Sequence, residues 1–245
     1  MYKLYNGDCL EVMKNIPDRS IDMILCDLPY GTTACKWDIV IPFDLLWEQY
    51  KRIIKSNGII CLFGSQPFTS ELVCSNIKWF SHCWIWKKEQ GTNILCCNML
   101  PLKIHEDILI FRKPNNRKGK LTYNPQMIAG KPYIKKRNNR VVYDPIIDKY
   151  TKQTDTFNKG ERYPTTVIEF NREKNRLHPT QKPVKLLEYL VKTYTNEGET
   201  VLDNCMGSGS TGIACMNTNR NFIGIEKDEK YFEIAKNRII ESKTA

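Results

Sequence analysis

The segment "ETVLDNCMGSGSTGIACM", Glu199–Met216, decides the fold class. Its apolar start predicts a β-strand, and its glycines predict a tight turn that leads into a helix. Gly207, Gly209 and Gly212 form a Gly-x-Gly-x-x-Gly pattern, which lets the backbone approach a ligand closely. Glu226 ends the next predicted strand, where a carboxylate can accept hydrogen bonds from both hydroxyls of a ribose. We therefore predict a turn that binds a nucleoside rather than a purely structural turn.

Asp203 helps to choose between two nucleoside ligands that the glycine pattern leaves open. It ends the strand directly before the glycines. A carboxylate this close would repel the pyrophosphate of a dinucleotide, whereas it could bind the cationic amino group of a methionine. The segment therefore favours S-adenosylmethionine.

Predicted strands and helices alternate along most of the remaining chain. Such alternation predicts an α/β fold with a mostly parallel, doubly wound sheet that helices cover on both faces. The helix expected over residues 42–55 should end at Asn57–Gly58. Further strands are predicted over residues 3–7, 20–27, 59–64, 83–88, 107–113 and 221–228, and further helices over 8–16, 68–77, 182–195 and 229–242.

The stretch "CDLPYGTT", Cys26–Thr33, contains the end of the strand predicted over residues 20–27. An acid at the carboxyl end of a strand is badly placed for a core. It is well placed for a ligand, because ligands bind at that edge of open α/β sheets. Asp27 is therefore a candidate site residue.

Positive charge is concentrated in one part of the chain. The net charge is +10, and residues 114–176 hold 15 of the 37 Lys and Arg residues but only 6 of the 27 Asp and Glu residues. Seven aromatic residues are interleaved with this charge, and a surface that meets nucleic acid can use both kinds. We predict a segment that binds a polyanion rather than a solvated loop.

Composition argues against several other classes of protein. No apolar run approaches the roughly 20 residues that a membrane helix needs, and the polar, acidic N-terminus is unlike a signal peptide. Ten cysteines without a Cys-x-x-Cys pair indicate reduced thiols in a cytoplasmic protein without a metal site.

The segment Asp27–Tyr30 and the glycine turn together resemble motifs of the amino-group DNA methyltransferases, which use S-adenosylmethionine. The hallmark of that family is Asp/Asn/Ser-Pro-Pro-Tyr/Phe/Trp, and Asp27–Tyr30 matches it at three of four positions, with Leu28 in place of a proline. The segments His178–Pro183 and Gly7–Met13 resemble two further stretches of the family. The resemblance does not cover residues 114–176.

The glycine turn matches the cofactor loop of the family, Asp-x-Phe-x-Gly-Ser-Gly-Thr-Thr. Cys205 replaces the phenylalanine, and Ser210 replaces a threonine conservatively. The matching residues are Asp203, Gly207, Ser208, Gly209 and Thr211.

The order of these motifs resembles the β group of the family, a circular permutation of the common methyltransferase sheet. The resemblance therefore implies a Rossmann-like sheet whose first strand lies between the strand of Glu226 and the strand of Asp27. It divides the chain into a catalytic half (1–113), an irregular basic insertion for target recognition (114–176) and a cofactor-binding half (177–245).

The resemblance implies a role for each residue of "DLPY". The exocyclic amino group of a base is a poor nucleophile, because its lone pair is delocalised into the ring. The Asp27 side chain and the Leu28 carbonyl would accept its protons in hydrogen bonds and so aim the lone pair. Pro29 would hold the turn rigid, and Tyr30 would stack on the target base after that base has left the duplex.

Cofactor contacts are also implied by the resemblance. Glu226 would bind the ribose hydroxyls, and Asp8 with the Cys9 backbone would bind the adenine edge. Lys182 and Thr180 would meet the methionine carboxylate. The remaining contacts would come from Asp27, Asp203, Gly207, Ser208, Gly209, Ser210 and Thr211.

The densest charge of the insertion is "KKRNNR", Lys135–Arg140. Lysines and arginines there would contact phosphates, and asparagines could pair with adenine edges. The predicted DNA contacts are Lys135, Lys136, Arg137, Asn138, Asn139 and Arg140.

The leading interpretation is a DNA N6-adenine methyltransferase, because Asp27 opens the hallmark where N4-cytosine members usually have serine. N4-cytosine methylation stays open. A nicotinamide-dependent oxidoreductase would not explain "DLPY" or the insertion, and the intact Asp27, Asp203 and Glu226 argue against a degenerate DNA-binding module. DNA is the expected partner and a membrane is not. A homodimer and a cognate restriction endonuclease are partners that the resemblance allows.

Overall fold

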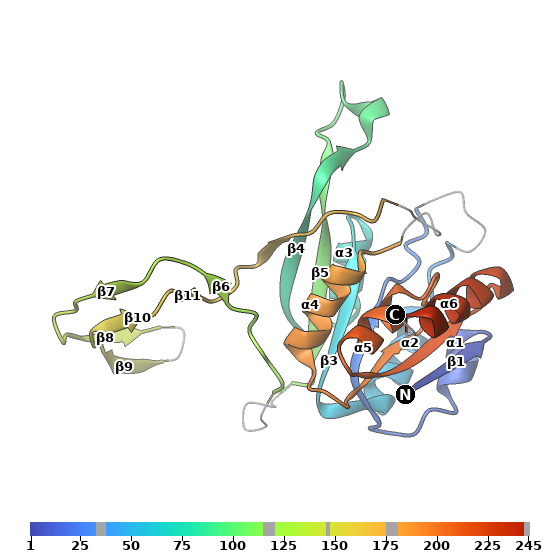
Figure 1. Cartoon of the computed structure of the whole chain (residues 1–245), viewed down its shortest axis with the longest axis horizontal. Helices are drawn as coiled ribbons and strands as arrows, with labels where there is room; N and C mark the ends of the chain where they lie inside the picture. The colour runs from blue at the N-terminus through green and yellow to red at the C-terminus, as the bar shows by residue number, and fades with distance from the viewer. Residues whose placement is uncertain (33–37, 115–120, 146–147, 175–180, 243–245) are drawn as a thin grey trace. The chain divides into compact units, whose positions relative to one another are not determined.

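The chain forms two compact units in the computed structural model (Figure 1). The large unit comprises Met1–Asn124 and Thr166–Ala245, and the small unit comprises Pro125–Thr165. The structure describes residues 1–32, 38–114, 121–145, 148–174 and 181–242.

The large unit is built on a sheet that has eight strands among the described residues. Parallel pairing joins most neighbours, and β5 runs antiparallel to both β3 and β4. The predicted α/β class with a mostly parallel sheet is thus confirmed. In spatial order the strands are β1 (Tyr2–Asn6), β14 (Asn221–Glu226), β13 (Thr200–Asp203), β2 (Ile21–Cys26), β3 (Ile54–Gly64), β5 (Lys103–Arg112), β4 (Phe80–Thr92) and β12 (Val167–Glu169).

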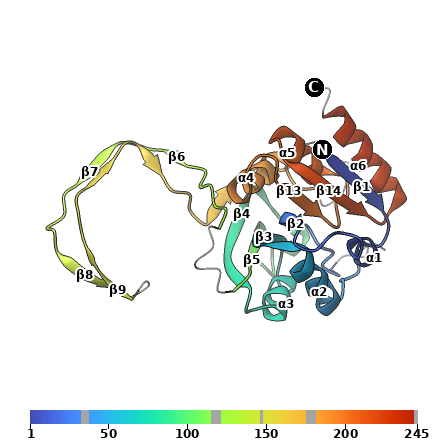
Figure 2. The same cartoon turned by 90° about the horizontal axis from the view of Figure 1, so that it is seen from below.

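Helices cover both faces of this sheet (Figure 2). Two apolar clusters explain the arrangement: one joins the sheet to α4, α5 and α6, and the other joins it to α1, α2 and α3. In the described part of the chain, no helix has both the length and the apolar character that crossing a membrane requires. The helices are α1 (Cys9–Met13), α2 (Phe43–Ile53), α3 (Phe68–Ser75), α4 (Val184–Tyr194), α5 (Ser210–Asn217) and α6 (Glu229–Glu241), with a 3₁₀ turn η1 (Ile94–Cys96) between β4 and β5.

The prediction for the first strand is wrong. β13, not β1, lies between β14 and β2, and β1 pairs with β14 from the outer side. Burial explains the order: Val201, Leu202 and Asp203 of β13 are all buried, whereas three of the five residues of β1 are exposed. A strand with exposed residues suits the edge of a sheet better than its centre.

The prediction that Asn57–Gly58 ends a helix is also wrong. α2 ends at Ile53, and the two residues lie inside β3. A Cβ atom at Gly58 would stand 2.8 Å from the carbonyl oxygen of Asp22 in β2. The glycine therefore permits a close approach of two strands rather than a turn.

The short strand β12 was not predicted. It pairs in parallel with Ile85, Trp86 and Lys87 of β4. Its residues fall within the insertion predicted over 114–176, so that this part of the predicted insertion belongs to the large unit.

The small unit lies inside the predicted insertion and consists of antiparallel ladders. None of its described residues is buried. It therefore has no apolar core among these residues, and its order rests on backbone pairing and on side-chain contacts such as that of the Arg162 guanidinium, 4.7 Å from the Tyr133 ring centre. The ladders pair β6 (Ile128–Ala129) with β11 (Glu161–Arg162), β7 (Tyr133–Lys135) with β10 (Thr156–Asn158) and β8 (Val141–Asp144) with β9 (Lys149–Lys152).

Candidate active site

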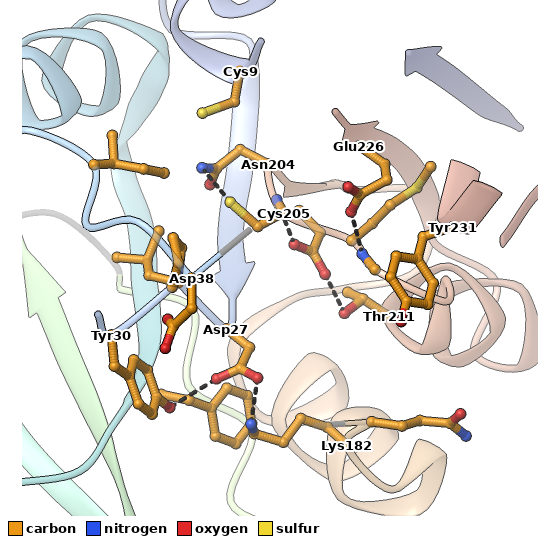
Figure 3. A pocket seen from close by; sticks show the side chains of 18 of the residues that line it. Cys9, Asp27, Tyr30, Asp38, Lys182, Asn204, Cys205, Thr211, Glu226 and Tyr231 are labelled. Atoms are coloured by element: carbon orange, nitrogen blue, oxygen red, sulfur yellow. Dashed lines mark hydrogen bonds and ion pairs between the residues drawn. The ribbon is translucent and has the colours of Figure 1, made fainter. Parts of the chain in front are cut away.

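A cavity of about 780 Å³ in the large unit brings together residues from both halves of the predicted site (Figure 3). It lies at the carboxyl ends of β2, β13 and β14, the edge where open α/β sheets bind ligands. Gly209 is not among the lining residues, and Thr180 lies outside the described residues. The predicted residues that line the cavity are Asp8, Cys9, Asp27, Leu28, Pro29, Tyr30, Lys182, Asp203, Gly207, Ser208, Ser210, Thr211 and Glu226.

Two glycines in the left-handed conformation shape the turn between β13 and α5. Their φ angles are +51° at Gly207 and +80° at Gly209. A Cβ atom at Gly209 would stand 2.9 Å from the Cβ of Ala235 in α6, so both conformation and packing require glycine there. The Gly207 amide donates to Glu226 Oε2 at 2.8 Å, which fastens the turn to the end of β14.

Asp203 is a buried acid in the wall of the cavity, with 4% of its surface exposed. Its Oδ1 accepts a hydrogen bond from the Cys205 amide at 3.1 Å, and its Oδ2 accepts one from the Thr211 hydroxyl at 2.6 Å. Burial raises the pKa of Asp203 to about 7, against these two hydrogen bonds. Once ionised in such surroundings, the carboxylate attracts a cation more strongly than it would in water.

Glu226 and Asp8 reach the cavity from the neighbouring strands β14 and β1. Glu226 Oε1 accepts from the Asp228 amide at 2.9 Å, and burial raises the pKa of Glu226. Asp8 follows β1 and caps α1 by accepting from the Leu10 amide at 3.0 Å. Its second oxygen lies 3.1 Å from the Lys227 ammonium. The two acids thus have backbone partners that fix their positions.

Asp27 leaves the end of β2 with both carboxylate oxygens in contact with side chains (Figure 3). The Tyr30 hydroxyl donates to Oδ1 at 2.7 Å, and the Lys182 ammonium donates to Oδ2. The Tyr30 ring stacks on Phe68, with ring centres 4.8 Å apart and planes 26° from parallel. Burial raises the pKa of Asp27, while the charge of Lys182 lowers it. Residues of the site itself therefore hold the carboxylate in place.

The Asp38 side chain binds the backbone directly after "DLPY". The sequence analysis did not predict this residue as part of the site. Its two carboxylate oxygens accept hydrogen bonds from the Gly31 and Thr32 amides, both at 2.9 Å. This side chain, which is 8% exposed, thus binds the two residues that follow Tyr30. No motif in the sequence links Asp38 to these amides, because the pairing exists only in the folded protein.

Lys182 lies against Asp27 and Glu106. Its side chain is 8% exposed, and its ammonium lies 3.3 Å from Glu106 Oε2 and 4.9 Å from the centre of the Phe63 ring. The contact that the resemblance implies, with the carboxylate of the cofactor, stays a prediction.

Glu106 and Lys88 are further cavity residues that sequence reasoning missed. Glu106 lies on β5, which runs antiparallel to β3, so its N-terminal half reaches the edge where the parallel strands end. The available signal was the acidic pair Glu106 and Asp107, directly before the apolar run of "HEDILIF".

The predicted DNA contacts lie in the small unit, at the last residue of β7 and in the segment between β7 and β8. The Arg137 amide donates to Asp155 Oδ1 at 2.7 Å, and Asn139 has a positive φ of 51°, as a turn residue does. Arg137 is half-buried, and the exposed members are Lys135, Lys136, Asn138, Asn139 and Arg140.

A mostly parallel sheet with a glycine turn and three strand-end acids around one cavity has the architecture of the α/β methyltransferases. Comparisons with known proteins agree. A family model described as DNA methylase matches residues 21–237. The chain is 29% identical over 255 residues to the type II methyltransferase M.HpaI of Haemophilus parainfluenzae, an alignment that covers 97% of this chain and 74% of that protein.

Solved structures are similar over nearly the whole chain. The structure of an M1.HpyAVI–SAM complex is 28% identical, with a TM-score of 0.65 over 97% of this chain and 100% of that one. The cytosine-N4-specific PvuII DNA methyltransferase shares the fold, with a TM-score of 0.67 over 99% of this chain and 91% of that one at 13% identity.

The chain belongs to the DNA methylase family. It is a DNA methyltransferase that uses S-adenosylmethionine, which confirms the predicted family and cofactor. The family has both N6-adenine and N4-cytosine members.

Proposed function

We propose that this methyltransferase acts on the N6 amino group of adenine. The observation that supports adenine is the carboxylate of Asp27 in the wall of the cavity, at the position where N4-cytosine members usually have serine. A carboxylate accepts a hydrogen bond from the amino group and stabilises positive charge on its nitrogen.

In the proposed complex, Asp27 Oδ1 and the Leu28 carbonyl accept hydrogen bonds from the amino group of the flipped base. Oδ1 now accepts from the Tyr30 hydroxyl, so the base amino group takes over that hydrogen bond. The Tyr30 ring, supported from behind by Phe68, offers its other face to the base. Pro29 keeps the turn between the acid and the ring short and rigid.

The cavity residues also suit the proposed cofactor contacts. S-adenosylmethionine supplies an electrophilic methyl group on a sulfonium. Asp203 would hold the cationic amino group, and Glu226 would accept hydrogen bonds from the ribose hydroxyls. Asp8 and the Cys9 backbone would bind the adenine edge, while Thr180 would meet the methionine carboxylate. The backbone of residues 207–211 would complete the contacts.

The small unit is the proposed target-recognition element. Its charge supports this role: residues 125–165 hold nine Lys and Arg residues against four Asp and Glu residues. Exposed aromatic side chains accompany the charge, including Tyr150 and Phe157, which are 77% and 69% exposed. Basic and aromatic groups together suit phosphates and unstacked bases.

We further propose a homodimer and a cognate restriction endonuclease as partners. The relatives named as type II methyltransferases support the second proposal. Sedimentation of the purified protein with and without DNA tests the first, and cleavage of unmethylated DNA by a co-expressed neighbouring gene product tests the second.

Incubation with labelled S-adenosylmethionine and unmethylated DNA, followed by nucleoside separation, tests the proposed base. We expect label in N6-methyladenine. Label in N4-methylcytosine alone would refute the adenine proposal and leave the enzyme class intact.

A further inference from the structure

Four side chains of alternating charge lead from Asp27 into the wall of the cavity. Lys182 donates to Asp27 Oδ2, its ammonium lies 3.3 Å from Glu106 Oε2, and Lys88 donates to Glu106 Oε1. The side chains of Lys88, Glu106 and Lys182 are only 9%, 15% and 8% exposed. Charges buried to this degree are stable only when they are paired.

The surroundings keep these charges out of water. The Lys182 ammonium lies 4.9 Å from the centre of the Phe63 ring, and the Lys88 ammonium lies 5.1 Å from that of Trp86. Glu106 Oε2 is buried and makes no hydrogen bond with a described residue, so its contact with Lys182 is electrostatic. Burial opposes the ionisation of Glu106, yet Lys182 and Lys88 lower its pKa to about 2. The two lysines therefore favour the ionised form of Glu106.

We propose that Glu106 is a positioning residue that, through Lys182, keeps Asp27 competent as the acceptor for the base amino group. A buried Lys182 paired with Asp27 alone would cancel much of the field that Asp27 exerts on the base. With Glu106 on its other side, the ammonium is shared between two carboxylates, and Lys88 balances Glu106. The inference rests on the role proposed for Asp27 but not on the identity of the base.

The charge of this row matters because the reacting nitrogen becomes positive. Its lone pair forms the bond to the methyl carbon, the electrons of the carbon–sulfur bond remain on sulfur, and the nitrogen then loses one proton to water. With all four side chains ionised, the row is neutral. Without the charge of Glu106, two lysines and Asp27 leave it with one net positive charge, which opposes the charge that develops on the nitrogen.

The test compares Glu106→Gln with the double variant Lys88→Met, Glu106→Gln. The single variant carries the extra positive charge, whereas the double variant restores neutrality with an apolar side chain against Trp86. At saturating cofactor and DNA we expect Glu106→Gln to lower kcat by about 10- to 100-fold, with KM for DNA changed less than about threefold. We expect kcat of the double variant to be at least about tenfold higher than kcat of Glu106→Gln.

A purely structural role of Glu106 predicts the opposite order, because removing a second buried side chain would only add damage. Kcat of Glu106→Gln near the wild-type value, or a double variant no faster than the single one, would overturn the proposal. If Glu106→Gln does not fold, the double variant must keep kcat within about tenfold of wild type, or the proposal fails.

Glu169→Gln is the matched control, because Glu169 forms an exposed pair at 2.8 Å with Lys87, the neighbour of Lys88 on β4. We expect it to leave kcat unchanged. The rate is measured as total methyl incorporated, so a methylated cytosine product would refute the adenine proposal without affecting this test.

Discussion

The basic side chains of the large unit's cavity and those of the small unit work in different settings. Lys182 is 8% exposed and contacts two carboxylates in the cavity. Lys135 and Lys136 lie on the surface of a unit that has no buried residue among those described. A buried charge acts on one neighbour at short range, whereas exposed charges act together and are screened by salt. The same residue type can therefore serve chemistry in one unit and affinity in the other.

The two units also differ in what stabilises their structures. Two apolar clusters fix the strands whose ends carry Asp27, Asp203 and Glu226. The small unit relies on short ladders and on surface contacts. Placement within a fraction of an ångström matters for aligning a reacting atom, while phosphate contacts tolerate variation because they depend on charge more than on angle. The following predictions test this division of roles.

The largest effect is expected from Asp27→Ala in the cavity. Methyl transfer should fall by about 100- to 1000-fold, because the acceptor for the amino group is removed, while affinity for S-adenosylmethionine stays within about tenfold. Single-turnover rates and calorimetry measure the two quantities. Asp44→Ala, at an exposed position of α2, is the control and should behave as wild type. Near-normal turnover by Asp27→Ala would refute the assignment.

A smaller, salt-dependent effect is expected in the small unit. Replacing Lys135, Lys136 and Arg137 by Gln should lower DNA affinity and reduce the slope of log affinity against log salt by up to about 0.9 for each phosphate that the variant no longer neutralises. Affinity for S-adenosylmethionine should not change. Titrations of labelled DNA at several salt concentrations provide the measurement.

A matched triple variant in the large unit controls for net charge. Lys14, Lys78 and Lys230 are exposed, and their replacement by Gln removes the same charge elsewhere. If both triple variants reduce the slope of log affinity against log salt equally, the small unit has no special role in DNA binding. Asn138→Ala or Asn139→Ala should alter sequence preference more than affinity, which selection from a randomised duplex pool would reveal.

The sequence predicted the parts of the site that are contiguous in the chain. Asp27–Tyr30 and the turn at Gly207 and Gly209 are local motifs, and their residue types follow from the conformation and chemistry required there. The spacing of apolar residues is also a local feature, and it predicted most helices and strands. Sheet order was not accessible in this way, because the position of β13 depends on which strand tolerates burial on both sides.

The missed residues share one property: their partners are distant in the chain or depend on a folded loop. Glu106 meets Lys182 only because β5 runs antiparallel beside β3 and because the chain reaches the cavity again directly before α4. Asp38 binds the Gly31 and Thr32 amides, a pairing that exists only in the folded protein. In the small unit, composition predicted the charge but not the ladders, because strands of two to four residues carry too little pattern.

A moderate effect is expected from Glu226→Ala. Removing hydrogen bonds between a charged group and the ribose should weaken cofactor binding by about 1–3 kcal/mol. Glu226 also accepts a hydrogen bond from the Gly207 amide. Thermal melting of the variant therefore checks that the loss of this bond does not unfold the protein. Glu229→Ala, at an exposed position in the first turn of α6, is the control for calorimetry. Unchanged affinity of the Glu226 variant would exclude the ribose contact.

The smallest effect is a dependence of cofactor affinity on pH that originates in Asp203. Burial raises the pKa of this acid to about 7 in the unliganded protein, and binding of a cationic amino group requires its ionised form. Affinity should therefore rise with pH, by about tenfold between pH 6 and pH 8, and level off above that range. The stability of the unliganded protein depends on the pKa of Asp203 with the opposite sign. The folded state keeps a proton that the unfolded chain releases, so the contribution of Asp203 to the free energy of unfolding falls as pH rises from about 4 to 7. Calorimetric titrations of wild type and Asp203→Asn over this range distinguish the effect of Asp203 ionisation from that of Asp27 and Cys26, which lie near it. The variant should bind more weakly at pH 8 and lose the pH dependence. If the dependence persists in Asp203→Asn, another group of the cavity is responsible and the contact with the amino group is refuted.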